Sequence, residues 1–130
     1  MSKQLAEEFI QALQDLEASR NTQSIITLFA DECEVSNVVS PRNYVGKVGA
    51  QDFWQNYRDT FDQVQSRFRN TIVMDGKVAL EWTTEGTVKD GAPIQYDGVS
   101  ILETQAGKII RFCAYFDPNH LGHQMVQSKS

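Results

Sequence analysis

The sequence predicts an α+β domain, with helices in the first half of the chain and a curved antiparallel sheet in the second half. Two observations carry this prediction. Apolar residues recur at helical spacing before Ser66, whereas β-rich segments separated by glycine-containing pairs follow it. The length of 130 residues suits one domain, which we expect to span residues 1–130.

Composition and charge restrict the classes of function. Lys and Arg number 12 against 17 Asp and Glu, for a net charge of −5. Nucleic-acid binding, which relies on a basic face, is therefore not expected. Cys33 and Cys113 form no CxxC pair and are expected to be free thiols. We find no signal peptide and no apolar run of the roughly 20 residues that cross a membrane, which predicts a cytoplasmic protein without membrane contact.

Two helices and a strand are expected in the first 39 residues. Residues 3–19 carry apolar side chains at helical spacing, namely Leu5, Phe9, Leu13 and Leu16. After an interruption at Asn21-Thr22, a shorter helix is expected around Ile25 and Ile26. Residues 33–39 are rich in β-branched side chains and predict a strand, which is followed by a loop at 40–43.

A third helix is expected after Gly49, where apolar residues form one broad stripe. The stripe consists of Phe53, Trp54, Tyr57, Phe61 and Val64. Such a stripe is typical of a helix face that packs against a core. Trp54 and Tyr57 also carry polar tips, and side chains of this kind often line cavities.

Four strands in a meander are expected over residues 66–74, 77–88, 94–105 and 108–117. The segments are separated by Asp75-Gly76, Asp90-Gly91 and Ala106-Gly107. Tight hairpin turns need positive φ angles, which glycine adopts without strain. These three pairs therefore predict three consecutive hairpins.

Turn length sets the register, and the register decides which face each side chain takes. Two-residue turns at Asp90-Gly91 and Ala106-Gly107 would pair Trp82 with Val99 and Ile101 with Phe112. The face expected toward the helices then carries Leu80, Trp82, Thr84, Asp97, Val99, Ile101, Phe112, Ala114 and Phe116. The opposite face is amphipathic, and we expect it to form a homodimer contact.

Asp97 is the ionisable exception on the expected inner face. A carboxylate in an apolar hollow can serve as a general acid or base near neutral pH. The alternative is that Asp97 lies at a solvent-exposed rim, or in a bulge at Asp97-Gly98.

The register of the first hairpin leaves two alternatives. A two-residue turn at Asp75-Gly76 would direct Arg67 and Arg69 inward. A three-residue turn through Lys77 would instead direct inward Phe68, Asn70, Ile72 and Met74. The second set is more apolar and is preferred, and it adds the Asn70 amide to the pocket wall.

The order of these elements resembles the nuclear transport factor 2-like superfamily. Three segments carry the resemblance: LFADECEV at 28–35, GKVGAQDFWQNY at 46–57 and GKIIRFCAYFDPNHL at 107–121. The resemblance implies the cystatin-like cone of ketosteroid isomerase, limonene epoxide hydrolase and the SnoaL-like polyketide cyclases, in which three helices pack on a curved antiparallel sheet. It implies little about activity, because this fold supports enzymes, binding modules and assembly domains.

The catalytic positions of two of these enzymes are not kept. The aspartate base, tyrosine donor and protonated aspartate of ketosteroid isomerase fall on Asn37, Phe9 and Val99. The acidic and basic positions of limonene epoxide hydrolase fall on Trp82, Thr84 and Ala114, its tyrosine falls on Val35, and only its asparagine is kept, as Asn37. The resemblance therefore implies neither steroid isomerisation nor epoxide hydrolysis by those routes.

Asp117 resembles the acid/base aspartate that SnoaL-like cyclases place at the end of the last strand. It alternates with Cys113 and Tyr115, which directs it away from the hollow unless the chain bends at 116–118.

The preferred interpretation is a homodimeric domain that binds a small apolar or amphipathic molecule. The expected ligand-binding residues are Asn37, Trp54, Tyr57, Asn70, Trp82, Thr84, Val99, Phe112, Ala114 and Phe116. The alternative is an isomerase, cyclase or lyase in which Asp97 or Asp117 acts as acid or base, with no metal or other cofactor. A third interpretation is an assembly domain with a filled cone.

Overall fold

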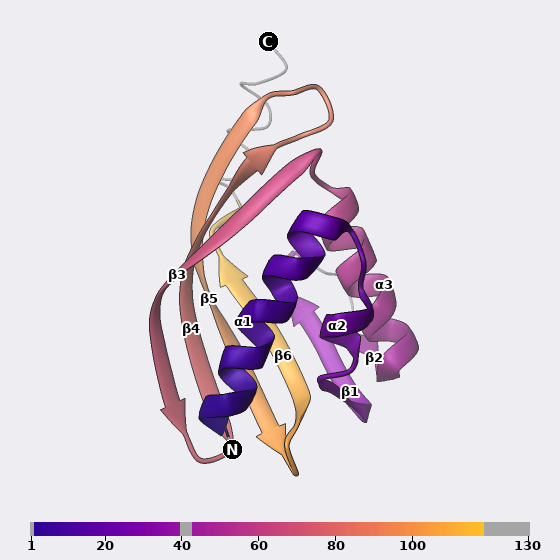
Figure 1. The fold of residues 1–130 in the computed structure, drawn as a ribbon, viewed down its shortest axis with the longest axis vertical. Coiled ribbons are helices and arrows are strands. Elements are labelled where there is room, and N and C mark those ends of the chain that lie inside the picture. Colours follow the sequence, from indigo (N-terminus) through magenta and orange to yellow (C-terminus); the bar gives the residue numbers. More distant parts are fainter. Residues whose placement is uncertain (1, 40–42, 119–130) are drawn as a thin grey trace.

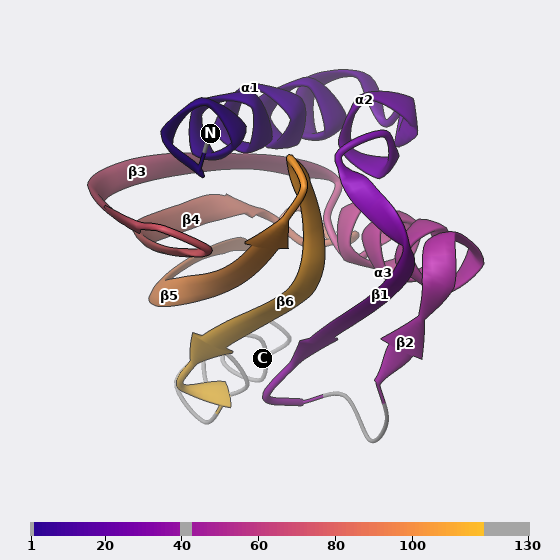
Figure 2. The same cartoon turned by 90° about the horizontal axis from the view of Figure 1, so that it is seen from below.

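The computed structural model describes residues 2–39 and 43–118. In these residues, helices α1 (Ser2–Ser19), α2 (Gln23–Ile26) and α3 (Gly46–Asp59) pack against one curved sheet (Figures 1 and 2). Its six strands are β1 (Phe29–Asn37), β2 (Tyr44–Val45), β3 (Gln63–Met74), β4 (Lys77–Thr87), β5 (Pro93–Gln105) and β6 (Lys108–Phe116). The α+β class is confirmed.

The sheet is mixed but mostly antiparallel, with the strand order β2-β1-β6-β5-β4-β3. Strands β3 to β6 form the predicted meander, and β1 adds to β6 in parallel. Helix α1 contacts β3, whereas α3 contacts β1 and β2, so the two long helices cover different parts of the sheet (Figure 2). The expected strand at 33–39 begins earlier, at Phe29, and the third helix begins at Gly46 rather than after Gly49.

The core lies between the helices and one face of the sheet. Helix α1 buries the side chains that the helical spacing predicted, namely Leu5, Phe9, Leu13 and Leu16. Helix α3 buries Phe53 and Trp54 against them. None of the helices in the described ranges is long and apolar enough to cross a membrane.

The β4–β5 register differs from the prediction by one residue. The connection runs from Val88 to Ala92, and the Val88 amide donates to the Ala92 carbonyl at 3.0 Å. It is therefore longer than the predicted two-residue turn. As a result, Trp82 pairs with Gly98 instead of Val99, and Thr84 pairs with Tyr96 instead of Asp97.

This shift inverts the faces of β5, because side chains alternate along a strand. Tyr96 and Ser100 are buried on the inner face. Asp97, Val99 and Ile101 were expected there and instead lie on the outer face, so their predicted orientation is wrong.

Gly98 explains why this register suits the sheet. A Cβ atom at Gly98 would lie 2.5 Å from Cη2 of Trp82 and 2.6 Å from the Tyr115 carbonyl oxygen. Contacts this close require displacement of the indole or the backbone. The missing side chain therefore leaves the space that the Trp82 ring occupies.

A bulge in β6 restores the predicted orientation of the last strand. Gln105 pairs with Lys108 as the two-residue turn predicted, but the register shifts so that Glu103 pairs with Arg111. The extra residue between these pairs reverses the alternation. Because this reversal compensates for the shift in β5, the inner face still carries Phe112, Ala114 and Phe116.

The first hairpin has the two-residue turn, with Met74 paired to Lys77, so the preferred three-residue turn is wrong. A register shift between Phe68 and Asn70 then divides the strand. Phe68 packs on the inner face, as preferred. Asn70, which pairs with Glu81, lies on the outer face and is exposed, as are Ile72 and Met74. Arg67 and Arg69 are exposed too, so neither alternative describes the whole strand.

We expect Gly98→Ala to lower the free energy of unfolding by about 1–3 kcal/mol, because the new methyl group collides with the Trp82 indole. Denaturant unfolding measures this loss. In a Trp82→Phe background the smaller ring leaves more room, so the two substitutions should couple by about 0.5 kcal/mol or more in a double-mutant cycle. Equal losses in both backgrounds would show that the indole is not the constraint.

Candidate functional site

A cavity of about 210 Å³ lies between the helices and the inner face of the sheet. Most of its lining is aromatic or aliphatic, which is typical of a site for small organic molecules. The exposed lining residues Val39, Asn56 and Thr60 mark the side on which the cavity reaches the surface. The deeper lining consists of buried side chains, among them Phe9, Trp54, Trp82, Tyr96 and Phe112.

The structure places most of the expected ligand-binding residues around this cavity. Those that line it are Asn37, Trp54, Tyr57, Trp82, Thr84, Phe112, Ala114 and Phe116. Asn70 and Val99 do not line it, because both lie on the outer face of the sheet.

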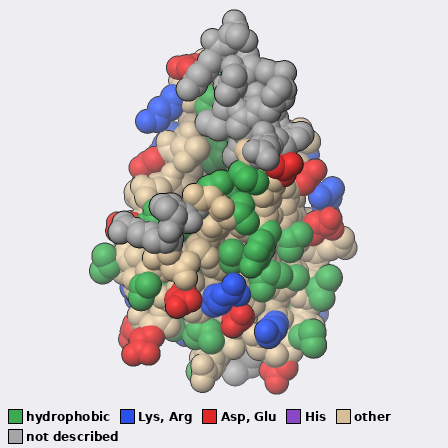
Figure 3. All heavy atoms as spheres, turned by 180° about the vertical axis from the view of Figure 1, so that it is seen from behind, with side chains coloured by type: hydrophobic (Ala, Val, Ile, Leu, Met, Phe, Trp, Pro, Cys, Tyr) green, Lys and Arg blue, Asp and Glu red, His purple; other side chains and the backbone are tan. Residues whose placement is uncertain are grey.

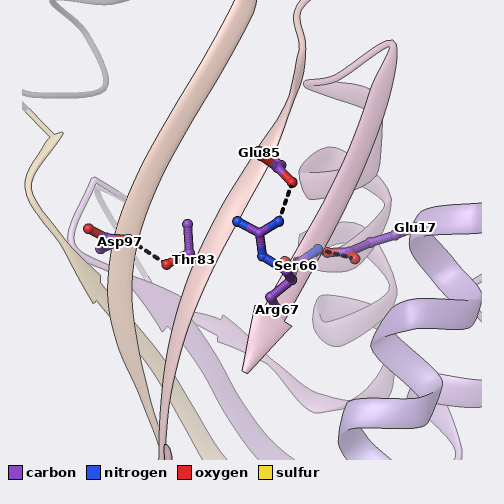
Figure 4. A network of polar contacts seen from close by, with 6 residues as sticks. All are labelled: Glu17, Ser66, Arg67, Thr83, Glu85 and Asp97. Carbon is purple, nitrogen blue, oxygen red and sulfur yellow. Dashed lines mark hydrogen bonds and ion pairs between the residues drawn. The ribbon is translucent and has the colours of Figure 1, made fainter. Parts of the chain in front are cut away.

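The two candidate catalytic aspartates also lie outside the lining. Asp97 is 64% exposed and accepts a hydrogen bond from the Thr83 hydroxyl at 2.6 Å, while Arg69 lies 3.7 Å away. Figure 4 shows Asp97 and Thr83 on the side of the strands facing away from the helix that carries Glu17. Asp117 follows Phe116, which lines the cavity, and its own side chain is exposed. The structure therefore does not bring either carboxylate to the hollow.

Aromatic rings pack edge to face around the cavity. The ring centroids of Trp54 and Phe112 are 5.0 Å apart, and those of Trp82 and Tyr96 are 5.5 Å apart at 90°. Tyr96 also contacts Phe116 at 5.3 Å. Such pairs favour fixed relative orientations, so these walls are well defined before any ligand binds.

The two indoles of the cavity differ in their hydrogen bonding. Nε1 of Trp82 donates to Oγ of Ser100 at 2.9 Å. Nε1 of Trp54 is buried and has no hydrogen-bond partner among the described residues. An unpaired buried donor is uncommon in folded proteins, so the Trp54 N–H group is the least satisfied polar group of the lining.

A buried carboxylate lies directly behind one wall of the cavity. Glu17 is 4% exposed, and its Oε1 accepts a hydrogen bond from the Ser66 amide at 2.8 Å. Its Oε2 accepts from Oγ of Ser66 at 2.6 Å and from the Tyr57 hydroxyl at 2.7 Å. Figure 4 shows Glu17 reaching from α1 to Ser66 on β3. Oγ1 of Thr84 lies 2.7 Å from Oγ of Ser66 and completes this cluster of Glu17, Tyr57, Ser66 and Thr84, which we call the Glu17 cluster.

The Glu17 cluster affects two tyrosine hydroxyls. Burial, and then the negative charge of Glu17, raise the pKa of Tyr57 well above its usual value. The same two causes, in the same order, raise the pKa of Tyr96. Although part of the Tyr57 side chain reaches solvent, its hydroxyl donates to the buried carboxylate of Glu17. Both groups therefore stay neutral far into the alkaline range.

Sequence reasoning missed Glu17, Ser66, Tyr96 and Ser100. Glu17 follows Leu13 by four positions, so the helical spacing already placed it on the buried stripe of α1. Tyr96 and Ser100 were missed because the predicted register directed them outward. Within the described residues, no group of three or more His, Cys, Asp or Glu side chains could hold a metal ion.

Solved structures with the same fold are available for comparison. A protein from Rhodopseudomonas palustris, provisionally described as an isomerase, superposes with a TM-score of 0.84 at 16% identity, covering 98% of this chain and 99% of its own. A nuclear transport factor 2-like protein from Anabaena variabilis reaches 0.83 at 16% identity, with 92% of each chain covered. A protein of ketosteroid isomerase-like fold from Catenulispora acidiphila, crystallised with trimethylamine, reaches 0.79 at 18% identity, covering 90% of this chain and 91% of its own.

At these identities the solved structures establish the fold and not the activity. No curated protein matches the chain. The model of the SnoaL-like domain matches residues 6–112, which is most of the chain and includes most of α1, all of α3 and nearly all of the meander. The chain has the nuclear transport factor 2-like fold, and it belongs to the SnoaL-like domain family.

Proposed function

We propose that the protein binds a small, mostly apolar molecule that carries a hydrogen-bond acceptor. The observation that carries this proposal is the buried, unpaired Nε1–H group of Trp54, a residue whose side chain lines the cavity. Leaving such a donor unsatisfied costs about 1–3 kcal/mol. A carbonyl, ether or similar oxygen on a bound ligand would recover part of that free energy.

The size and lining of the cavity support a compact ligand. A volume of about 210 Å³ is below the roughly 300–1,000 Å³ of sites that hold drug-sized molecules. A molecule of one or two rings suits this space, and its faces would contact rings such as those of Trp54, Trp82 and Phe112. The trimethylamine complex of the Catenulispora acidiphila protein supports a small-molecule role for a domain of this fold.

Binding is favoured over catalysis by Asp97 or Asp117. A general acid or base must lie within hydrogen-bond reach of the reacting proton. Neither carboxylate lines the cavity, and Asp97 is engaged by Thr83 on the outer face. The cavity itself is hollow, which argues against an assembly domain with a filled cone.

We also propose that the outer face of the sheet forms a homodimer contact. Exposed apolar side chains on this face include Ile72, Met74 and Tyr115. Figure 3 shows hydrophobic side chains gathered on the side of the molecule behind the view of Figure 1, with charged side chains of both signs around them. A two-fold interface needs a patch that complements itself, and a mixed-charge border around an apolar centre meets that need.

The ligand proposal is tested with acetophenone and α-methylstyrene, which have nearly the same shape but differ in the carbonyl oxygen. We expect the protein to prefer acetophenone by about 2–10-fold in Kd, which corresponds to one hydrogen bond of about 0.5–1.5 kcal/mol. In Trp54→Phe this preference should disappear, since phenylalanine has no N–H donor. Calorimetric titration measures all four affinities. Equal binding of both probes to the unaltered protein, or binding of neither, would refute the proposal.

The raised pKa values of Tyr57 and Tyr96 predict how stability depends on pH. Below about pH 10, both the folded and the unfolded chain keep these protons, so their contribution is constant. Above that pH the unfolded chain loses them first, and the free energy of unfolding should fall by up to about 1.4 kcal/mol per pH unit for each tyrosine. Urea unfolding between pH 9 and 11 measures the slope, which Tyr57→Phe should make shallower. An unchanged slope in that variant would contradict the assignment.

The dimer proposal is tested by Ile101→Lys, which places a charge on the outer face of β5. We expect sedimentation equilibrium to show a dimer for the unaltered protein and a monomer for this variant, because an unpaired charge in an apolar contact is unfavourable. Val48→Lys is the matched control, since Val48 is 78% exposed and belongs to helix α3 rather than to the outer face of the sheet. A monomeric unaltered protein would exclude the contact.

A further inference from the structure

We infer that the cavity selects ligands that donate a hydrogen bond or carry a positive charge, and that it rejects anions. This inference rests on the proposed function, because it concerns the same cavity and specifies the chemistry of its ligand. It follows from the wall formed by Tyr57, Ser66 and Thr84, and from the carboxylate of Glu17 behind that wall.

The first step is to locate the hydroxyl protons of the Glu17 cluster. A carboxylate only accepts hydrogen bonds, and each hydroxyl has a single proton to donate. Tyr57 and Ser66 both lie within 2.7 Å of Oε2 of Glu17, so the proton of each hydroxyl is directed to that oxygen. Neither hydroxyl then has a proton left for a ligand.

The same reasoning extends to Thr84. Its Oγ1 lies 2.7 Å from Oγ of Ser66, and either atom could donate by geometry alone. Because the Ser66 proton is already directed to Glu17, Thr84 is the donor in this contact. Tyr57 and Thr84 both line the cavity, and their hydroxyl protons are already committed, so these hydroxyls can meet a ligand only as hydrogen-bond acceptors.

The negative charge of Glu17 favours the same ligands as the hydrogen-bond acceptors of the wall do. None of the ion pairs formed within the described ranges includes Glu17. The buried Arg58 approaches it, but Nε of Arg58 donates to the main-chain carbonyl of Glu17 at 3.0 Å and Nη1 to that of Phe61 at 3.0 Å. The charge of Glu17 already opposes ionisation of Tyr57 and Tyr96. A ligand anion at this wall would be opposed in the same way.

The acceptor hydroxyls, the negative charge of Glu17 and the unpaired N–H group of Trp54 together define a class of ligand. The rings of Trp54 and Tyr57 are neighbours, with centroids 5.8 Å apart, so the two side chains that carry the donor and the acceptor are adjacent in the cavity lining. The aromatic lining also favours a cation over an anion. A small aromatic amide or alcohol meets both hydrogen-bond conditions, whereas a carboxylate of the same shape has no proton to donate and carries a negative charge.

Benzamidine, benzamide and benzoate test this inference, because they share a shape and carry a charge of +1, 0 and −1 at neutral pH. In calorimetric titration of the unaltered protein, we expect benzamidine and benzamide each to bind on the order of tenfold or more tighter than benzoate. Benzoate bound as tightly as benzamide would overturn the inference.

Glu17→Gln is the decisive variant. The glutamine amide can donate to Tyr57 or Ser66, which frees hydroxyl protons for the cavity and removes the negative charge. The affinity ratio of benzamide to benzoate should then fall to about one. Glu8→Gln, on the exposed face of the same helix, changes the net charge equally and should leave the ratio unchanged. A ratio that persists in Glu17→Gln, or that falls equally in Glu8→Gln, would contradict the assignment to Glu17.

Acetophenone binding separates failure of this inference from failure of the proposed function. If acetophenone binds but benzoate is not disfavoured, the cavity is a ligand site without the charge selectivity inferred here. If none of the probes binds, both proposals fall. Should Glu17→Gln not fold, Thr84→Val provides the second test, because it removes an acceptor but keeps the charge. This variant should bind benzamide several-fold more weakly, and its affinity for benzoate should stay low. An unchanged affinity for benzamide would contradict the role of this wall.

Discussion

The buried carboxylate of Glu17 is the constraint on which the cavity depends. It receives hydrogen bonds from Tyr57 on α3 and Ser66 on β3, and through Ser66 it reaches Thr84 on β4. A buried carboxylate is costly unless its oxygens are hydrogen-bonded, so these partners stabilise the folded domain. The Glu17 cluster therefore joins both long helices to the sheet beside the cavity, whose lining includes Tyr57, Ser66 and Thr84.

The same constraint links stability to recognition. The contacts that satisfy Glu17 also decide which way the hydroxyl protons point, and hence what the cavity wall offers to a ligand. The pairing of β4 with β5 also shapes the cavity. Gly98 lies opposite Trp82 and leaves room for its indole, and the same register directs Asp97 to the outer face. The polar groups of the cavity lining, in the described residues, are hydroxyls, indoles and the amides of Asn37 and Asn56, with one carboxylate behind the wall.

Sequence reasoning reached the fold class because the relevant signals are local. The stripe from Leu5 to Leu16 and the glycine pairs at 75–76, 90–91 and 106–107 each report on a few adjacent residues. Register is not local in this way. Asp90-Gly91 suggests a two-residue turn, yet the connection closes between Val88 and Ala92, and the bulges in β3 and β6 leave no mark in the sequence. Ala114 and Phe116 were placed correctly because two departures from the ideal pattern cancelled.

The site was predictable where it consists of large apolar side chains and unpredictable where it consists of polar ones. Trp54, Trp82 and Phe112 belong to periodic stripes, whereas Ser66 and Ser100 acquire their roles from partners distant in the sequence. Glu17 is intermediate, because its helical position is readable but a glutamate near a helix end is ordinarily solvent-exposed.

Indole NMR tests the central claim, that a ligand enters this cavity and engages Trp54, most directly. The chain has two tryptophans, so a ¹⁵N–¹H spectrum contains two indole N–H resonances, which Trp54→Phe assigns. On titration with acetophenone, the Trp54 resonance should move downfield as its proton gains an acceptor, while that of Trp82, already bonded to Ser100, should move far less. A Trp54 resonance that stays in place at saturating acetophenone would contradict the account.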